Sequence, residues 1–262
     1  MKSPQQSNSQ TPSQTIVITG GSAGIGAAVA RRFDEPGNNI VLLARRKEKL
    51  KQVGDTLTKA RVVFHSLDIT SRSDVEEVFA KILSDVGPVD LLINNAGVAF
   101  GLDPAQKSDL EEWEKCVDVN VKGLLYCTHA VLPSMVERNQ GQIINLGSTA
   151  GSYPYPGGNV YCGTKAFVHQ FSLSLRSDLL GTAIRVSCVE PGLVGGTEFS
   201  MVRFRGDASK AKGAYEKTKP LTPEDIAEVI FFTASIPPHV NLNTIEMMPV
   251  CQAPASLSVH KS

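Results

Sequence analysis

The sequence carries no net charge and lacks the long apolar runs of a membrane protein. Its 262 residues contain 26 Lys and Arg against 26 Asp and Glu. A chain without excess positive charge has no electrostatic attraction for nucleic acid or an anionic membrane, so neither is an expected partner. No apolar run approaches the ~20 residues of a membrane span. Residues 1–14 also lack the apolar stretch of a signal peptide, and we expect a soluble, cytoplasmic protein.

Cysteine and histidine are few, and neither shows a metal-binding spacing. The five cysteines form no CxxC pair, and the five histidines include no pair at the spacing of a zinc site. We therefore expect reduced thiols and no metal. With 42% hydrophobic and 20% charged residues, the composition is that of one globular domain.

Short apolar runs rich in β-branched residues alternate with segments of helix length. Most of the runs are continuous, which is typical of strands buried on both faces of a parallel sheet. Segments 74–86, 113–138 and 160–180 have helical length. The order predicts a single-domain α/β doubly wound Rossmann fold with a seven-stranded parallel sheet flanked by helices. The predicted strands are 15–19, 39–43, 62–66, 89–94, 142–146, 183–189 and 244–247.

The domain boundaries follow from composition. Residues 1–14 are rich in Ser, Gln, Pro and Thr and are expected to form a disordered tail. Residues 15–250 form the predicted dinucleotide-binding catalytic domain, and 251–262 a C-terminal tail. Residues 195–219 are longer than a plain connection and are a candidate lid.

A glycine-rich turn, TGGSAGIG at 19–26, follows the first strand. Gly20, Gly24 and Gly26 would allow a tight turn that brings backbone N–H groups at a helix N-terminus to a pyrophosphate. The alternative is a plain turn with a helix cap. Because the turn lies between the first strand and a helix, we expect it to bind a dinucleotide, together with Ser22, Ala23 and Ile25.

The end of the second strand indicates the type of cofactor. An NAD site usually has an Asp or Glu about 20 residues beyond the glycines. Here Arg45 and Arg46 follow Ala44, and two guanidinium groups suit the 2′-phosphate of NADP. The alternative is that they begin a solvated helix.

The ends of the third and fourth strands also lie at the predicted ligand-binding edge. Asp68, beside Ile69, could accept a hydrogen bond from the adenine amino group, or it could serve only as a turn residue. Asn95, Ala96 and Gly97 follow the fourth strand at the same edge.

Tyr161 and Lys165 are four residues apart on a predicted helix, so they share one face. Ser148 follows the fifth strand. A Lys ammonium ~4–5 Å from the phenol would lower the Tyr pKa by about two to three units, which makes Tyr161 a useful acid or base. Ser148 could orient the substrate oxygen. These residues suit a ketone–alcohol oxidoreductase.

Together the motifs resemble the short-chain dehydrogenase/reductase family over about residues 14–250. The resemblance is carried by TGGSAGIG, LDIT at 67–70, NNAG at 94–97, DVNVKG at 118–123, YCGTK at 161–165 and PGLV at 191–194. It implies a catalytic tetrad in which Asn120 joins Ser148, Tyr161 and Lys165, with Asn120 holding a water in a proton relay. It also implies that Pro191, Gly192, Val194 and Thr197 lie along the nicotinamide.

The resemblance is stronger to one subgroup, the NADP-dependent 3-hydroxy acid (serine or L-allo-threonine) dehydrogenases. The segments 147–167, 191–207, 221–230 and 244–250 carry it. It implies oxidation of small 3-hydroxy acids such as 3-hydroxypropionate, or reduction of malonic semialdehyde. The alternatives are a carbonyl reductase for neutral ketones, a non-catalytic NADP sensor, and an epimerase or dehydratase, which generally has a larger C-terminal domain.

Charged residues of the candidate lid could bind substrate. Arg203 and Arg205 are candidates for a substrate carboxylate, and Glu198 for a substrate ammonium. The alternative is that all three are solvated lid charges. The segments 113–138 and 160–180 carry more apolar surface than a one-sided helix needs. Since short-chain dehydrogenases pair these two helices across a two-fold axis, we expect a homotetramer.

Overall fold

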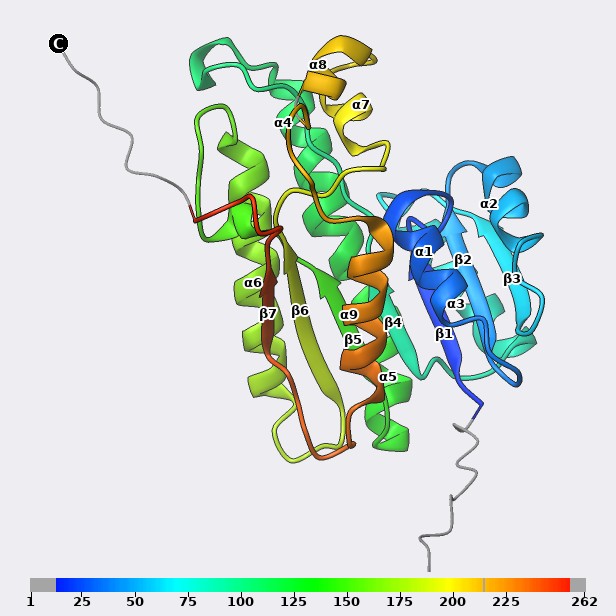
Figure 1. The fold of residues 1–262 in the computed structure, drawn as a ribbon. Helices are drawn as coiled ribbons and strands as arrows, with labels where there is room; N and C mark the ends of the chain where they lie inside the picture. Colours follow the sequence, from blue (N-terminus) through cyan, green and yellow to red (C-terminus); the bar gives the residue numbers. More distant parts are fainter. Residues whose placement is uncertain (1–12, 214, 255–262) are drawn as a thin grey trace, which may run out of the picture.

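A seven-stranded parallel sheet lies between two layers of helices (Figure 1). The computed structural model describes residues 13–213 and 215–254. The strand order β3-β2-β1-β4-β5-β6-β7 reverses direction between β1 and β4 and confirms the predicted fold class. The strands are β1 Thr15–Thr19, β2 Asn39–Ala44, β3 Arg61–Ser66, β4 Leu91–Asn94, β5 Gln142–Leu146, β6 Arg185–Pro191 and β7 Thr244–Met247.

The helices cover both faces of the sheet. One hydrophobic core lies between the sheet and α1, α2 and α9, and another between the sheet and α3, α5 and α6. Neighbouring strand residues belong to different cores: Ile16 and Ile18 to the first and Val17 to the second, all fully buried. This explains the unbroken apolar runs. The helices of eight or more residues are α1 Gly24–Arg32, α2 Lys47–Gly54, α3 Arg72–Asp85, α4 Leu110–Val117, α5 Leu124–Arg138, α6 Asn159–Asp178 and α9 Pro223–Ser235.

The segment expected to be one helix over 113–138 is divided. A π-helical turn, Asp118–Gly123, joins α4 to α5. Gly123 packs so tightly there that an added Cβ would lie 2.6 Å from Ile69 Cδ1. The apolar period alone does not reveal such an insertion, because the apolar stripe continues through it.

Both predicted tails are shorter than expected on the side that meets the domain. The carbonyl of Gln14 accepts a hydrogen bond from the Asn39 amide at 2.8 Å, so Gln14, at the end of the predicted tail, is held against β2. At the other end, Gln252 Oε1 accepts from the Leu193 amide at 2.6 Å. Residues 251–254 therefore pack on the domain, while the tails over 1–12 and 255–262 lie outside the described residues.

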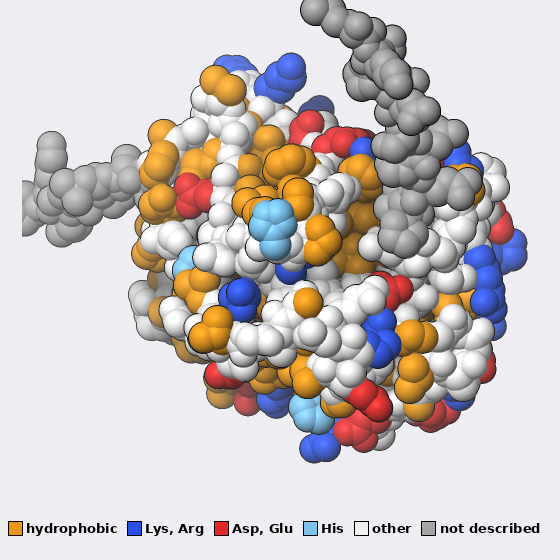
Figure 2. All heavy atoms as spheres, turned by 90° about the horizontal axis from the view of Figure 1, so that it is seen from below, with side chains coloured by type: hydrophobic (Ala, Val, Ile, Leu, Met, Phe, Trp, Pro, Cys, Tyr) orange, Lys and Arg blue, Asp and Glu red, His pale blue; other side chains and the backbone are white. Residues whose placement is uncertain are grey.

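Acidic and basic side chains are interspersed on the face at the amino ends of the strands (Figure 2). This is the distribution expected for a chain with balanced charge. Across residues 13–213 and 215–254, no helix is both long and apolar enough to cross a membrane. Two short helices, α7 Phe199–Arg203 and α8 Ala208–Gly213, lie in the candidate lid above the opposite edge (Figure 1).

Candidate active site

A cavity of about 1050 Å³ lies at the carboxyl ends of the strands. Turns that follow β1 to β6 form its walls, as expected where the strand order reverses. Of the predicted cofactor, catalytic and substrate residues, three do not line it: Gly26, Asn120 and Arg205. Those that do are Gly20, Ser22, Ala23, Gly24, Ile25, Arg45, Arg46, Asp68, Ile69, Asn95, Ala96, Gly97, Ser148, Tyr161, Lys165, Pro191, Gly192, Val194, Thr197, Glu198 and Arg203.

The glycine turn is shaped for an anion. Gly20 and Gly24 have φ of +68° and +52°, in the region that favours glycine. A Cβ at Gly26 would lie 2.4 Å from the Gly20 carbonyl oxygen, so Gly26 closes the turn without facing the cavity. The N-cap of α1, Ala23, offers no side-chain hydrogen bond, and the first turn has no acidic residue. Its N–H groups and helix dipole therefore fit a pyrophosphate.

Cations lie where the second strand ends. Arg46 donates to Ser22 Oγ at 3.3 Å and to Glu198 Oε2 at 2.6 Å, and Arg45 lines the same end of the cavity. Lys49, which the sequence did not single out, pairs with Glu198 Oε1 at 2.5 Å. This donor set fits the 2′-phosphate that distinguishes NADP from NAD.

Two residues of the adenine-side wall also shape the backbone. Asp68 Oδ1 accepts from the Thr70 amide and hydroxyl at 3.0 and 2.8 Å, so it fixes its own turn. Asn95 Nδ2 donates to the carbonyls of Thr19 and Gly20 at 2.9 and 3.3 Å. Asn95 thus fastens the glycine turn to the end of β4.

Ser148, Tyr161 and Lys165 meet at the other end of the cavity. Ser148 Oγ accepts from the Ala150 amide at 3.1 Å, which fixes it at the end of β5. Lys165 Nζ donates to the Leu146 carbonyl at 2.7 Å and lies 5.9 Å from the centre of the Tyr161 ring. The helical spacing in α6 therefore places both side chains on the cavity wall, as the sequence predicted.

Burial is the largest cause of the pKa shifts of Tyr161 and Lys165. It raises the pKa of Tyr161 above its ordinary value, while a hydrogen bond with Ser148 and the charge of Arg203 oppose the rise. Burial also lowers the pKa of Lys165 to about 8. The expectation that Lys165 holds the pKa of Tyr161 below 10 is therefore wrong for this structure. The ammonium points to the Leu146 carbonyl, and Arg203 is the cation that acts on the phenol.

The depressed pKa of Lys165 predicts a pH-dependent stability. The folded-state pKa lies below the unfolded value, so both states are protonated below pH 8 and the folded state carries the full cost of the buried charge. This cost falls as pH rises from 8 toward 10.5. Between pH 7 and pH 10, we expect the free energy of unfolding of the wild type to rise by about 2 kcal/mol relative to that of the Lys165→Met variant. Chemical denaturation of both proteins without cofactor measures it, and a pH-independent difference would contradict the buried charge.

The Asn120 side chain is fully engaged in the protein. Its Oδ1 accepts from the Val98 amide at 2.8 Å, and its Nδ2 donates to the Val98 carbonyl at 2.8 Å and to Thr164 Oγ1 at 3.0 Å. It is 2% exposed. Asn120 therefore links the π-helical turn to the loop after Gly97 and to α6, and its amide does not line the cavity.

Arg203 of the candidate lid lies at the end of the cavity that Tyr161 lines. The Arg203 guanidinium lies 5.5 Å from the centre of the Tyr161 ring and 5.2 Å from that of Tyr155. It donates to the Tyr155 hydroxyl and, at 3.3 Å, to the Gly101 carbonyl. Within the described part of the chain no carboxylate pairs with it. Arg203 therefore presents an uncompensated positive charge beside the Tyr161 phenol.

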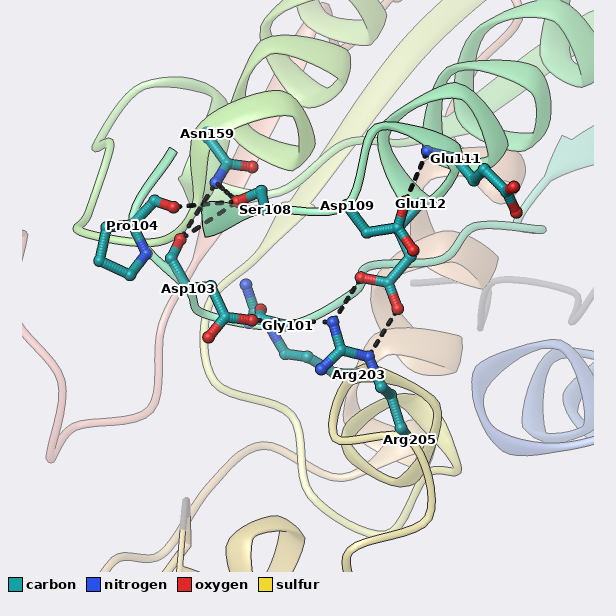
Figure 3. A network of polar contacts seen from close by, with 10 residues as sticks. All are labelled: Gly101, Asp103, Pro104, Ser108, Asp109, Glu111, Glu112, Asn159, Arg203 and Arg205. Atoms are coloured by element: carbon teal, nitrogen blue, oxygen red, sulfur yellow. Dashed lines mark hydrogen bonds and ion pairs between the residues drawn. The ribbon is translucent and has the colours of Figure 1, made fainter. Parts of the chain in front are cut away.

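The other two lid charges lie elsewhere. Arg205 forms two hydrogen bonds with Glu112 of α4, at 2.6 and 2.7 Å, outside the cavity (Figure 3). Its φ of +52° turns the chain away after α7. Glu198 faces Arg46 and Lys49 instead of the catalytic end. The structure thus supports neither Arg205 as a carboxylate ligand nor Glu198 as an ammonium ligand.

Sequence reasoning missed three residues of the site: Tyr155, Lys49 and Gln252. Tyr155 lies in the loop before α6 and Gln252 in the segment taken for a tail, and both line the cavity. Lys49 lies in the first turn of α2, three residues after Arg46. Helical spacing places the two side chains on the same face, so the sequence alone could have indicated Lys49. Over the described residues no group of three His, Cys, Asp or Glu could hold a metal, and the five cysteines are unpaired.

Known proteins are similar to this chain in sequence and in fold. A model of the short chain dehydrogenase family matches residues 14–207. The chain is 56% identical over 247 residues to the NADP-dependent 3-hydroxy acid dehydrogenase of Salmonella typhi, covering 94% of this chain and 99% of that protein. It is 44% identical over 252 residues to sulfoacetaldehyde reductase 2 of Chromohalobacter salexigens, with 95% and 99% covered. A solved closed form of serine dehydrogenase complexed with NADP⁺ matches with a TM-score of 0.90 and 51% identity, over 95% of this chain and all of that one.

Proposed function

The chain belongs to the short-chain dehydrogenase family, and from that premise we propose that it is an NADP-dependent dehydrogenase of small 3-hydroxy acids. It is an oxidoreductase that acts on CH–OH groups. The substrate class proposed is that of serine, L-allo-threonine and 3-hydroxypropionate, with malonic semialdehyde in the reductive direction. The relatives named above, which include a hydroxy acid dehydrogenase and a serine dehydrogenase, support this class.

The observation that carries the proposal is the position of Arg203. A guanidinium 5.5 Å from the Tyr161 ring would bind an anionic group only a few bonds from the carbon that reacts. A 3-hydroxy acid has its carboxylate two carbons from the carbinol carbon, and the planar fork of Arg suits a carboxylate. Tyr155 and the Gly101 carbonyl hold the guanidinium in place.

In this reaction Tyr161 transfers the proton and Ser148 orients the substrate. NADP, when bound, supplies the hydride acceptor, and NADPH the donor. Tyr161 Oη donates its proton to the carbonyl oxygen during reduction, and its phenolate form takes the hydroxyl proton during oxidation. Ser148 donates to the substrate oxygen and so orients it toward Tyr161. Because burial raises the pKa of Tyr161, the phenol is protonated at neutral pH and is ready to act as the acid in carbonyl reduction.

Lys165 and Asn120 contribute to this chemistry without exchanging the substrate proton themselves. Lys165, held by the Leu146 carbonyl, places a positive charge beside the site where the nicotinamide ribose would lie. Asn120 fixes the Val98 backbone next to Gly97, in the wall that faces Lys165. We assign Asn120 a positioning role, because its amide bonds to the Val98 backbone and to Thr164.

The test is the initial rate of nicotinamide reduction with NADP and NAD separately. The substrates are 3-hydroxypropionate, both serine enantiomers, L-allo-threonine and a neutral secondary alcohol. We expect turnover of the hydroxy acids with NADP and little with NAD. Activity confined to the neutral alcohol would contradict the substrate class while leaving the family and the proton donor intact.

A carbonyl reductase for neutral ketones is the second candidate. The catalytic end of the cavity also has an apolar wall, formed by Phe100, Leu102, Phe199, Val202 and Phe204. Phe199 lies 5.6 Å from the Tyr161 ring, where it would contact an uncharged substituent. The neutral alcohol in the assay above separates this candidate from the first.

We also propose a cytoplasmic homotetramer. The rings of Phe167 and Phe171 stack at 5.7 Å on α6, and both are partly exposed, which suits an interface between helices of two protomers. Five unpaired cysteines suit a reducing compartment. A monomeric sedimentation coefficient at micromolar concentration would contradict the assembly.

A further inference from the structure

A carboxylate from the lid reaches across the cavity to the cations at its adenine end. Glu198 directly precedes α7, and its two oxygens are bound separately, one by Arg46 at 2.6 Å and the other by Lys49 at 2.5 Å. Arg46 also donates to Ser22 Oγ at 3.3 Å. The carboxylate therefore lies among donors of the kind that a phosphate requires.

The neighbouring residue brings the same segment against the glycine turn. A Cβ placed on Gly24 would lie 3.3 Å from the side chain of Thr197, so the chain crosses the turn there. The two ion pairs hold the pKa of Glu198 down to about 2, and the carboxylate is therefore ionised at every physiological pH. A permanent negative charge thus lies beside Arg46.

We propose that Glu198 occupies the position of the 2′-phosphate of NADP between Arg46 and Lys49, and that NADP must displace it in order to bind. The inference rests on the NADP dependence proposed above. The loss of the two ion pairs with Glu198 offsets part of the favourable free energy with which Arg46 and Lys49 bind the phosphate. NAD has no 2′-phosphate and leaves these pairs intact. Glu198 therefore weakens the binding of NADP and leaves that of NAD unchanged.

Calorimetric titration of NADPH and NADH into the Glu198→Gln variant tests this. The amide keeps the size of the side chain and removes its charge. We expect the Kd for NADPH to fall about three- to tenfold, because two partly exposed ion pairs no longer compete, while the Kd for NADH stays within about twofold. The matched control is Glu224→Gln on α9, which removes an exposed ion pair with Arg31 of α1 and changes neither affinity.

Fragments of the cofactor localise the effect. The same variant binds 2′,5′-ADP more tightly than the wild type does and binds AMP equally well, because only the first has the 2′-phosphate. Adding Lys49→Gln to the Glu198→Gln protein then weakens NADPH binding and not NADH binding, since Lys49 has transferred from the carboxylate to the phosphate.

Two results would overturn the inference. Weaker binding of both dinucleotides by Glu198→Gln would mean that the carboxylate stabilises the bound cofactor instead of competing with it. Unchanged binding of both would mean that the ion pairs are incidental surface contacts. A wild type that binds NADH and not NADPH would refute the proposed NADP dependence itself, which is a distinct outcome.

Discussion

We expect the Tyr161→Phe variant to fold normally and to lose about three orders of magnitude in kcat, the usual contribution of a positioned proton donor. The change removes one oxygen atom and keeps the ring that packs at 5.6 Å against Phe199. It also removes the phenol oxygen, whose interaction with Ser148 lowers the pKa of Tyr161. Steady-state rates in both directions measure the loss.

The matched control is Tyr126→Phe on α5. Tyr126 is a partly buried residue that packs against the second core and does not line the cavity. Its loss of a hydroxyl should leave kcat within about twofold of the wild type. If Tyr161→Phe retained more than a tenth of the wild-type rate while binding NADPH normally, another group would be the proton donor.

The second large effect is expected from Arg203→Leu. Without the guanidinium, KM for 3-hydroxypropionate should rise about 10- to 100-fold, the usual cost of losing a hydrogen-bonded charge partner. The kcat should change less, because Tyr161, Ser148 and Lys165 remain in place. KM for a neutral secondary alcohol should stay the same or fall, since the cavity then becomes more apolar.

Arg205→Leu is the control for this experiment, two residues further along the same segment. It breaks two hydrogen bonds with Glu112 and leaves the cavity wall unchanged (Figure 3). An unchanged KM in both arginine variants would refute the role of Arg203. An equal rise in both would show that the lid as a whole, and not one guanidinium, determines substrate affinity.

The sequence predicted the architecture well because the five inner strands, β1, β2, β4, β5 and β6, are buried on both faces. Strands β1, β5 and β7 have the predicted bounds, and the other ends differ by at most two residues. The glycine turn, the two arginines after β2 and the Tyr–Lys pair lie on the cavity wall because the carboxyl ends of parallel strands meet at one edge.

Features that depend on packing in three dimensions were not predictable. The π-helical turn continues the apolar pattern of its neighbours and is invisible to periodicity. Arg203 and Arg205 look equivalent in sequence, but the left-handed conformation of Arg205 sends its side chain to Glu112. The pKa of Tyr161 depends on burial, which outweighs the charge that the four-residue spacing suggested.

The measurement that tests the central claim most directly compares two nearly isosteric substrates, 3-hydroxypropionate and 3-hydroxypropionamide. Both have the same hydroxyl and chain, and only the first has a negative charge for Arg203. With NADP and wild-type protein, we expect kcat/KM to be about 10- to 100-fold higher for the acid than for the amide. Equal values, or a preference for the amide, would contradict the account, because Arg203 would then play no part in choosing the substrate.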